Sequence, residues 1–155
     1  MSATEGLAVP ASRRGFTLVE MMLVMLIIGI LATLILPAYH GQVYRAQGAD
    51  VVGHVKSIVL AIKDYESDND TVPTGTGPAG APPSYLAPYA GSNLFVGPGT
   101  ITYQLSRPSA TAPPTLLIAS GSPGDVQVLL AASRALGSMA YTIGGGQSLG
   151  VTLPY

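Results

Sequence analysis

The chain has 155 residues, of which 48% are hydrophobic and only 10% are charged, and its formal net charge is -1. This length favours one domain. Soluble domains usually carry about 25% charged residues, so the apolar residues must be concentrated in one segment or buried unusually well. The near-neutral charge gives no direct evidence for a nucleic-acid partner. The absence of cysteine excludes disulfides, thiolate metal sites, iron-sulfur clusters and a cysteine nucleophile.

One apolar block, residues 16–39, explains part of the hydrophobic excess. Its sequence, FTLVEMMLVMLIIGILATLILPAY, contains a single charge, Glu20. A helix of this length would be about 36 Å long, which exceeds the roughly 30 Å of a hydrocarbon core. Arg13 and Arg14 precede the block, so the positive-inside rule predicts a cytoplasmic N-terminus and an exported remainder. We therefore expect a single membrane span.

Three kinds of N-terminal segment combine arginines with an apolar run: a cleaved secretory signal, a twin-arginine signal and a retained anchor. Residues 12–18 read SRRGFTL, which resembles the twin-arginine pattern. However, the block is longer and more apolar than a typical signal core, contains Glu20, and is followed only by a poor cleavage site at residues 36–38. These features favour a retained anchor over either signal.

The junction between the arginines and the apolar block has a specific pattern. Residues 14–20 read RGFTLVE and run directly into the apolar block with its Pro37. This arrangement resembles the class III signal of type IV prepilins. The resemblance continues through residues 37–47, PAYHGQVYRAQ, and through the tyrosine-containing helix end at residues 65–73. It covers roughly the first half of the chain, and the remainder carries no motif that matches this family.

The resemblance implies roles for five residues. In that family the prepilin peptidase, a membrane aspartyl protease, cuts after the glycine and methylates the new N-terminus. This implies cleavage between Gly15 and Phe16 and N-methylation of Phe16. It also implies assembly through Glu20 of one subunit and the Phe16 terminus of another, and a helix that loosens between Gly29 and Pro37 inside filaments. The alternatives are an unpaired Glu20 at lipid headgroup depth and an ordinary proline kink.

The physical reading of Glu20 agrees with that implied pairing. A lone carboxylate in an apolar helix is costly and is by default a functional candidate. Its natural partner is an amine, and cleavage after Gly15 would create one at Phe16, four residues away. Because an unpaired ion in hydrocarbon is penalised, subunits would dock at the stagger that neutralises it.

The helix is predicted to continue as an amphipathic half to about Glu66. Apolar residues recur at spacings of four and three, and this face would cover a sheet. The stripe comprises Val51, Val55, Ile58, Ile62 and Tyr65, widened by Val52 and Val59. The polar side carries Arg45, Asp50, His54, Lys56 and Lys63. Gly41, Gly48 and Gly53 weaken the helix, since glycine costs up to about 1 kcal/mol relative to alanine.

Two features of this helix invite a metal-site hypothesis, and neither meets the requirements. His54 has no second histidine near it. The run DYESDND at residues 64–70 alternates acids, but Asn69 occupies the glycine position of a calcium-binding EF-hand loop and Gly75 its bidentate glutamate position. We expect a solvated helix end and no metal site.

The second half of the chain, residues 71–155, is expected to be rich in loops and short strands. Ten prolines fall between residues 73 and 123, which excludes long helices there. Asp125 can cap a short helix that ends at Gly137, which is favoured over a strand. The triple glycine at residues 144–146 reads as the turn of a terminal hairpin. The predicted elements are strands at 101–106, 115–120, 139–143 and 150–153 and a helix at 125–136.

Together these elements predict an α+β fold. A long N-terminal helix, membrane-spanning in its first half and amphipathic in its second, packs on a small antiparallel sheet of about four strands. The expected organisation is a leader at 1–15, a transmembrane and filament-core half at 16–38, an amphipathic half at 39–70 and a globular head at 71–155.

No catalytic set and no cofactor site emerges, so we expect a protein that is not an enzyme. The resemblance implies a structural subunit of a type IV pilus-like filament, held in the bacterial inner membrane before assembly and extracellular afterwards. The implied partners are copies of itself, other pilins, the prepilin peptidase, the inner-membrane assembly platform and membrane lipid. The alternative is a monomeric exported binding protein or enzyme whose first 38 residues act as a signal or anchor.

Within the filament class, a minor pilin or a secretion-system pseudopilin is the further alternative. Many type IV pilins close their last strands with a disulfide, which this chain cannot form. That departure puts in doubt a receptor-binding role carried by disulfide-bounded loops. Major pseudopilins often have an acidic calcium site near the C-terminus, whereas Asp125 is the only acid after Asp70, so that subtype is disfavoured.

Overall fold

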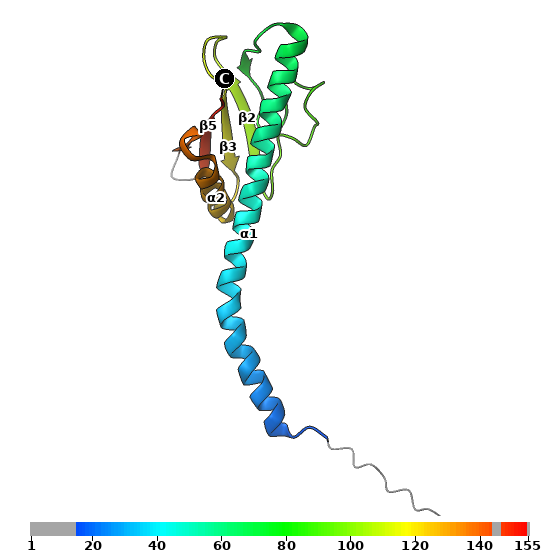
Figure 1. The fold of residues 1–155 in the computed structure, drawn as a ribbon, viewed down its shortest axis with the longest axis vertical. Helices are drawn as coiled ribbons and strands as arrows, with labels where there is room; N and C mark the ends of the chain where they lie inside the picture. The colour runs from blue at the N-terminus through cyan, green and yellow to red at the C-terminus, as the bar shows by residue number, and fades with distance from the viewer. Residues whose placement is uncertain (1–14, 144–146, 155) are drawn as a thin grey trace, which may run out of the picture. The chain divides into compact units, whose positions relative to one another are not determined.

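The computed structural model describes residues 15–143 and 147–154 (Figure 1). Their contacts group the chain into two units, Met1–Tyr39 and His40–Tyr155; the second is called the head below. In chain order the elements are α1 (Leu18–Asn69), β1 (Gly75–Thr76), β2 (Ile101–Arg107), β3 (Thr115–Ser120), α2 (Val126–Leu136), β4 (Ala140–Ile143) and β5 (Ser148–Thr152), with short 3-10 turns at Pro123–Asp125 and Gly137–Met139.

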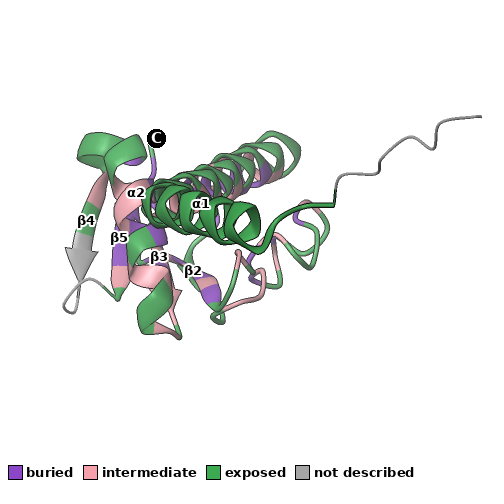
Figure 2. Cartoon of the chain, turned by 90° about the horizontal axis from the view of Figure 1, so that it is seen from below, coloured by how far each residue is buried: buried purple, intermediate pink, exposed green. Residues whose placement is uncertain are grey.

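The N-terminal part of α1 is an apolar helix that no other described residue covers. Every residue from 15 to 42 is exposed (Figure 2). The helix is long and apolar enough to cross a membrane by length and composition, a criterion that a signal sequence near the N-terminus would also meet. So much exposed apolar surface requires lipid or protein to cover it.

The head contains one antiparallel sheet in the order β1-β2-β3-β5-β4 (Figure 1). Strands β2 and β3 confirm the strands predicted at residues 101–106 and 115–120, and β2 buries every second side chain from Ile101 to Arg107. Strands β4 and β5 pair as the predicted hairpin; its triple glycine lies outside the described residues. The two-residue β1 is a fifth strand that the sequence did not reveal, because it lies in the proline-rich segment and pairs with the end of β2.

The core lies between the second half of α1 and the sheet. The predicted stripe is confirmed, because Val51, Val55, Ile58 and Ile62 are buried while Tyr65 is half-buried at the edge. These side chains pack with buried residues of β2, β3, β5 and α2. The proline-rich loop before β2 adds buried side chains that periodicity could not predict: Leu86, Ala90 and Phe95.

The helix α2 confirms the preference for helix over strand, but its predicted cap is wrong. Gly137, with φ 61°, ends the helix as expected. The Asp125 side chain makes no capping hydrogen bond to α2. Instead its carboxylate Oδ2 accepts hydrogen bonds from the Thr100 backbone N–H at 3.0 Å and from the Thr100 hydroxyl at 2.7 Å. Asp125 therefore ties the start of α2 to the turn before β2.

At Gly48, α1 packs directly against the backbone of α2. A Cβ added there would lie 2.8 Å from the Ala131 Cβ and 3.1 Å from the Ala132 backbone nitrogen, so α2 would have to move.

We expect Gly48→Ala to lower the free energy of unfolding by about 1–3 kcal/mol through overpacking, measured by chemical denaturation of the full chain in detergent. Gly53→Ala is the matched control, because nothing lies within 4 Å of its added Cβ. That exposed substitution should raise stability by up to about 1 kcal/mol. A Gly48→Ala variant as stable as Gly53→Ala would contradict the packing argument.

Candidate functional site

The first turn of α1 holds the Glu20 carboxylate through Thr17. The Thr17 backbone N–H donates to Glu20 Oε2 at 2.8 Å and the Thr17 hydroxyl donates to the same oxygen at 3.0 Å. In return the Glu20 N–H donates to Thr17 Oγ1 at 3.2 Å. This is a capping box, whose sequence signature of threonine followed three residues later by glutamate is present at residues 17–20. This contact was not predicted from the sequence, although its signature is visible there.

The predicted cleavage junction lies just before this turn. Gly15 has no atom within 4 Å of an added Cβ, and Phe16 is 76% exposed. Glu20 is exposed as well, so its carboxylate can contact Thr17 and still face a group outside the chain. Cleavage after Gly15, methylation of Phe16 and pairing of Phe16 with Glu20 stay predictions.

The two predicted points of flexibility, Gly29 and Pro37, both lie inside continuous helix. Pro37 has no N–H and cannot donate to the carbonyl of Thr33, four residues earlier. The Thr33 hydroxyl donates to the Ile30 carbonyl at 2.7 Å, which is a local bond within the same turn. The helix therefore lacks one backbone hydrogen bond within the predicted segment, and its loosening in a filament stays a prediction.

The acidic end of α1 is only partly the solvated surface that was expected. Asp64, Asp68 and Asp70 are exposed, but Glu66 accepts a hydrogen bond from Arg107 at 3.1 Å. Among the described residues no group of three or more potential ligands could hold a metal ion. The prediction of a fully solvated helix end is wrong for Glu66, because its partner lies 41 positions away in sequence and no local pattern marks the pair.

Arg107 is the buried polar centre of the head and was not singled out from the sequence. Its side chain is 1% exposed. Besides Glu66, its Nε donates to the Ala112 carbonyl at 3.0 Å and one terminal nitrogen donates to the Ala110 carbonyl at 3.2 Å. The guanidinium thus joins the end of α1 to the loop between β2 and β3. A cysteine-free head secures this loop by hydrogen bonds instead of a disulfide.

The His54 side chain packs against other residues of the head. Its Nδ1 lies 2.9 Å from the Leu94 carbonyl, and its ring stacks on Tyr103 with centroids 5.4 Å apart and an interplanar angle of 6°. The placement of His54 on the polar side of the helix is therefore wrong, because the loop before β2 covers it. Helical periodicity alone could not predict that cover.

Tyr103 carries a buried hydroxyl without a hydrogen-bond partner among the described residues. Burial raises the pKa of Tyr103 well above its usual value near 10, and the Asp50 charge adds to the rise. The folded chain thus retains the phenol proton longer than the unfolded chain, so stability is lost as the pH rises above about 10.

We therefore expect Tyr103→Phe to raise the free energy of unfolding by up to about 1 kcal/mol at neutral pH, because it removes an unsatisfied buried group. Between about pH 10 and 12 the variant should lose less stability than the wild type. Urea denaturation across this pH range measures both effects. Tyr141→Phe, at an exposed position, is the control and should leave both unchanged. A parallel pH dependence of wild type and Tyr103→Phe would contradict the prediction.

One family model and several curated relatives match part of this chain. Residues 10–36 match the family described as the prokaryotic N-terminal methylation motif. The fimbrial protein EcpC of Eikenella corrodens is 35% identical over 88 residues, which cover 57% of this chain and 58% of that protein. The type II secretion system core protein G of Klebsiella michiganensis is 41% identical over 63 residues, which cover 41% and 44% of the two chains.

A third relative, the type IV major fimbrial protein FimA of Dichelobacter nodosus, is 37% identical over 68 residues, covering 44% of this chain and 42% of the relative. The matches therefore span about half the length of these curated relatives. No solved structure matches. The relatives are named as fimbrial and secretion-system proteins rather than as enzymes.

Proposed function

We propose that this chain, a type IV pilin-like protein, is a structural subunit of a pilus-like filament. In this proposal the prepilin peptidase cleaves after Gly15 and methylates Phe16. Before assembly the subunit is anchored in the bacterial inner membrane with its N-terminus in the cytoplasm. It then polymerises on the inner-membrane assembly platform. Its partners are copies of itself or other pilins, and the finished filament is extracellular.

One observation carries the proposal: the part of α1 that lies within the methylation motif, residues 18–36, is apolar on every side and is exposed throughout. A helix that is hydrophobic all round requires burial in a membrane or a protein core. Its single acid, Glu20, lies four residues from the amine that cleavage would create at Phe16. Lipid can cover the helix before assembly, and the same helix of neighbouring subunits can cover it afterwards.

The test is the N-terminus of the exported chain. Mass spectrometry of material sheared from cells should find a chain that begins at Phe16 and carries one added methyl group. An intact Met1 leader would contradict processing. A soluble monomer that begins near Tyr39 would instead support an exported binding protein or enzyme with a cleaved signal.

Both a pilin and a secretion-system pseudopilin are compatible with this proposal, since curated relatives of both kinds match this chain. Electron microscopy separates the two roles when the chain is expressed at its natural level. Long surface filaments that contain the chain indicate a pilin, whereas a chain that supports secretion without surface filaments indicates a pseudopilin.

A further inference from the structure

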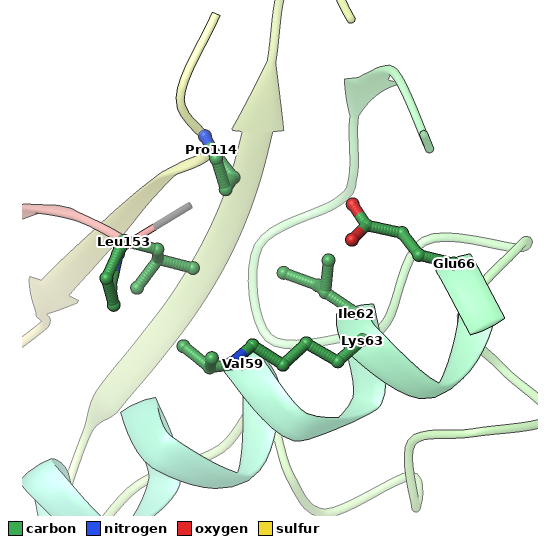
Figure 3. Close-up of a pocket in the computed structure, with 7 residues that line it drawn as sticks. Val59, Ile62, Lys63, Glu66, Pro114 and Leu153 are labelled. Carbon is green, nitrogen blue, oxygen red and sulfur yellow. The ribbon is translucent and has the colours of Figure 1, made fainter. Parts of the chain in front are cut away.

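Three grooves follow one another along one side of α1 in the head, and each is lined by a basic residue of that helix. The first lies between α1 and α2 and includes Arg45 and Arg134. The second includes Lys56. Figure 3 shows the third, where the Lys63 side chain lies opposite Leu153 near the end of β5. We call the surface defined by these four cations the basic groove.

The positions of the basic residues confirm that they share one side of the helix. Arg45, Lys56 and Lys63 are separated by 11 and 7 residues, which are close to three and two turns of an α-helix. The only acid that lines these grooves is Glu66, and its carboxylate is bonded to Arg107. The basic groove therefore has a net positive charge.

A second set of charges lies on another side of α1. Asp50, Asp64 and Asp68 are exposed and are separated by 14 and 4 residues, so they form one acidic edge. At 100° per residue, Asp50 lies about 140° around the helix from Arg45. Neither the acidic edge nor the basic groove forms an ion pair with any other described residue. Both sets of charges thus remain available to groups outside the chain.

We infer that the basic groove of one copy binds the acidic edge of the next copy. Each surface carries like charges, so docking a surface against itself is repulsive and a two-fold dimer is disfavoured. Docking one surface against the other is attractive. A contact between two different surfaces of identical subunits is heterologous. When the repeated contact does not close into a ring, the subunits form an open filament.

The sequence positions give this contact a direction and a stagger. Each acid follows its basic partner along the chain: Asp50 comes five residues after Arg45. Asp64 comes eight residues after Lys56, and Asp68 comes five residues after Lys63. Pairing them therefore requires a neighbouring copy displaced by about 8–12 Å along the helix. Glu20 follows Phe16 in the same direction, by four residues.

Apolar side chains in the groove add contact area to the charges. Leu60 and Met139 line the second groove and are 60% and 39% exposed. Exposed ion pairs contribute little affinity but set register and exclude wrong partners. The inference rests on the proposed function, since it names how the heads of the proposed filament meet.

Charge reversal tests the pairing in full-length chains expressed in a pilus-forming host. Lys56→Glu with Lys63→Glu, and separately Asp64→Lys with Asp68→Lys, should each lower the yield of sheared filaments by about tenfold, because two attractive contacts become repulsive. The chain with all four substitutions regains complementary surfaces and should recover most of the yield. Mass spectrometry of the membrane fraction checks that every variant is still processed.

A cysteine crosslink tests the geometry independently, because the chain has no cysteine of its own. Ala135 lines the basic groove, and Ser57 is an exposed residue of α1 between Asp50 and Asp64. Filaments of Ala135→Cys with Ser57→Cys should give a ladder of disulfide-linked dimers, trimers and longer species under oxidation. Each single variant should stay monomeric.

The outcomes separate this inference from the proposed function. If wild-type filaments form and both reversals leave their yield unchanged, the inference is overturned while the proposed function stands. If the lysine reversal lowers the yield and the fourfold variant does not recover it, the groove binds another anion, such as lipid phosphate, and the inference is again overturned. A wild-type chain that is exported only as a soluble monomer beginning near Tyr39 overturns both.

Discussion

Arg107→Met is expected to be the most destabilising substitution in the head. It removes a guanidinium that is 1% exposed and bonds to Glu66 and to two loop carbonyls, at Ala110 and Ala112. Removing one member of a buried ion pair typically costs about 3–5 kcal/mol. Glu66 is 26% exposed and can regain some water, so we expect a loss near the lower value, about 3 kcal/mol. This is a large part of the roughly 5–15 kcal/mol that stabilises a typical domain.

Urea denaturation of the full chain in detergent, followed by the near-ultraviolet circular dichroism of its tyrosines, measures this loss. Arg134→Met is the control, because Arg134 is exposed and its loss should change the free energy of unfolding by less than about 0.5 kcal/mol. Glu66→Gln with Arg107→Met should be less unstable than Arg107→Met alone, since no unpaired carboxylate remains. Equal stability of Arg107→Met and Arg134→Met would contradict the role given to the buried arginine.

Glu20→Gln is expected to lower filament yield by about tenfold or more, because a charge-assisted bond between subunits would be lost. The glutamine keeps an oxygen that can accept the Thr17 hydrogen bonds, so the first turn of α1 keeps its cap. The substitution therefore removes the charge and leaves the local structure. Processing after Gly15 should continue, which mass spectrometry of the membrane fraction can check.

Thr17→Ala is the matched control for that experiment. It removes the hydroxyl that contacts Glu20 but keeps the carboxylate and the Thr17 backbone N–H bond at 2.8 Å. We expect filament yield close to wild type. If Thr17→Ala reduces assembly as strongly as Glu20→Gln, the cap and not the charge is the critical feature. Normal assembly by Glu20→Gln would contradict the pairing of Glu20 with Phe16.

The sequence predicted the elements whose signal is local and periodic. The buried stripe from Val51 to Ile62 follows from helical spacing, and β2 follows from alternation within its seven residues. The short strand β1 and the buried loop residue Phe95 could not be predicted in this way. Their positions depend on pairing and packing with distant segments, and prolines and glycines obscure any local pattern there.

In the candidate site, too, contacts between residues close in sequence could be predicted, whereas contacts between distant residues could not. The motif at residues 14–20 could be identified because its residues are adjacent, and the cap between Thr17 and Glu20 could have been identified for the same reason. The Arg107–Glu66 pair could not, since nothing in the sequence around either residue indicates the other. The basic groove also requires the fold, because Arg134 reaches it from α2.

The most direct test of the account is the intact mass of the chain in purified filaments. The account predicts that filaments sheared from the cell surface contain this chain without residues 1–15 and with one methyl group on the Phe16 nitrogen. Filaments that lack the chain, or a chain that is found only as a soluble monomer or with its leader intact, would contradict it.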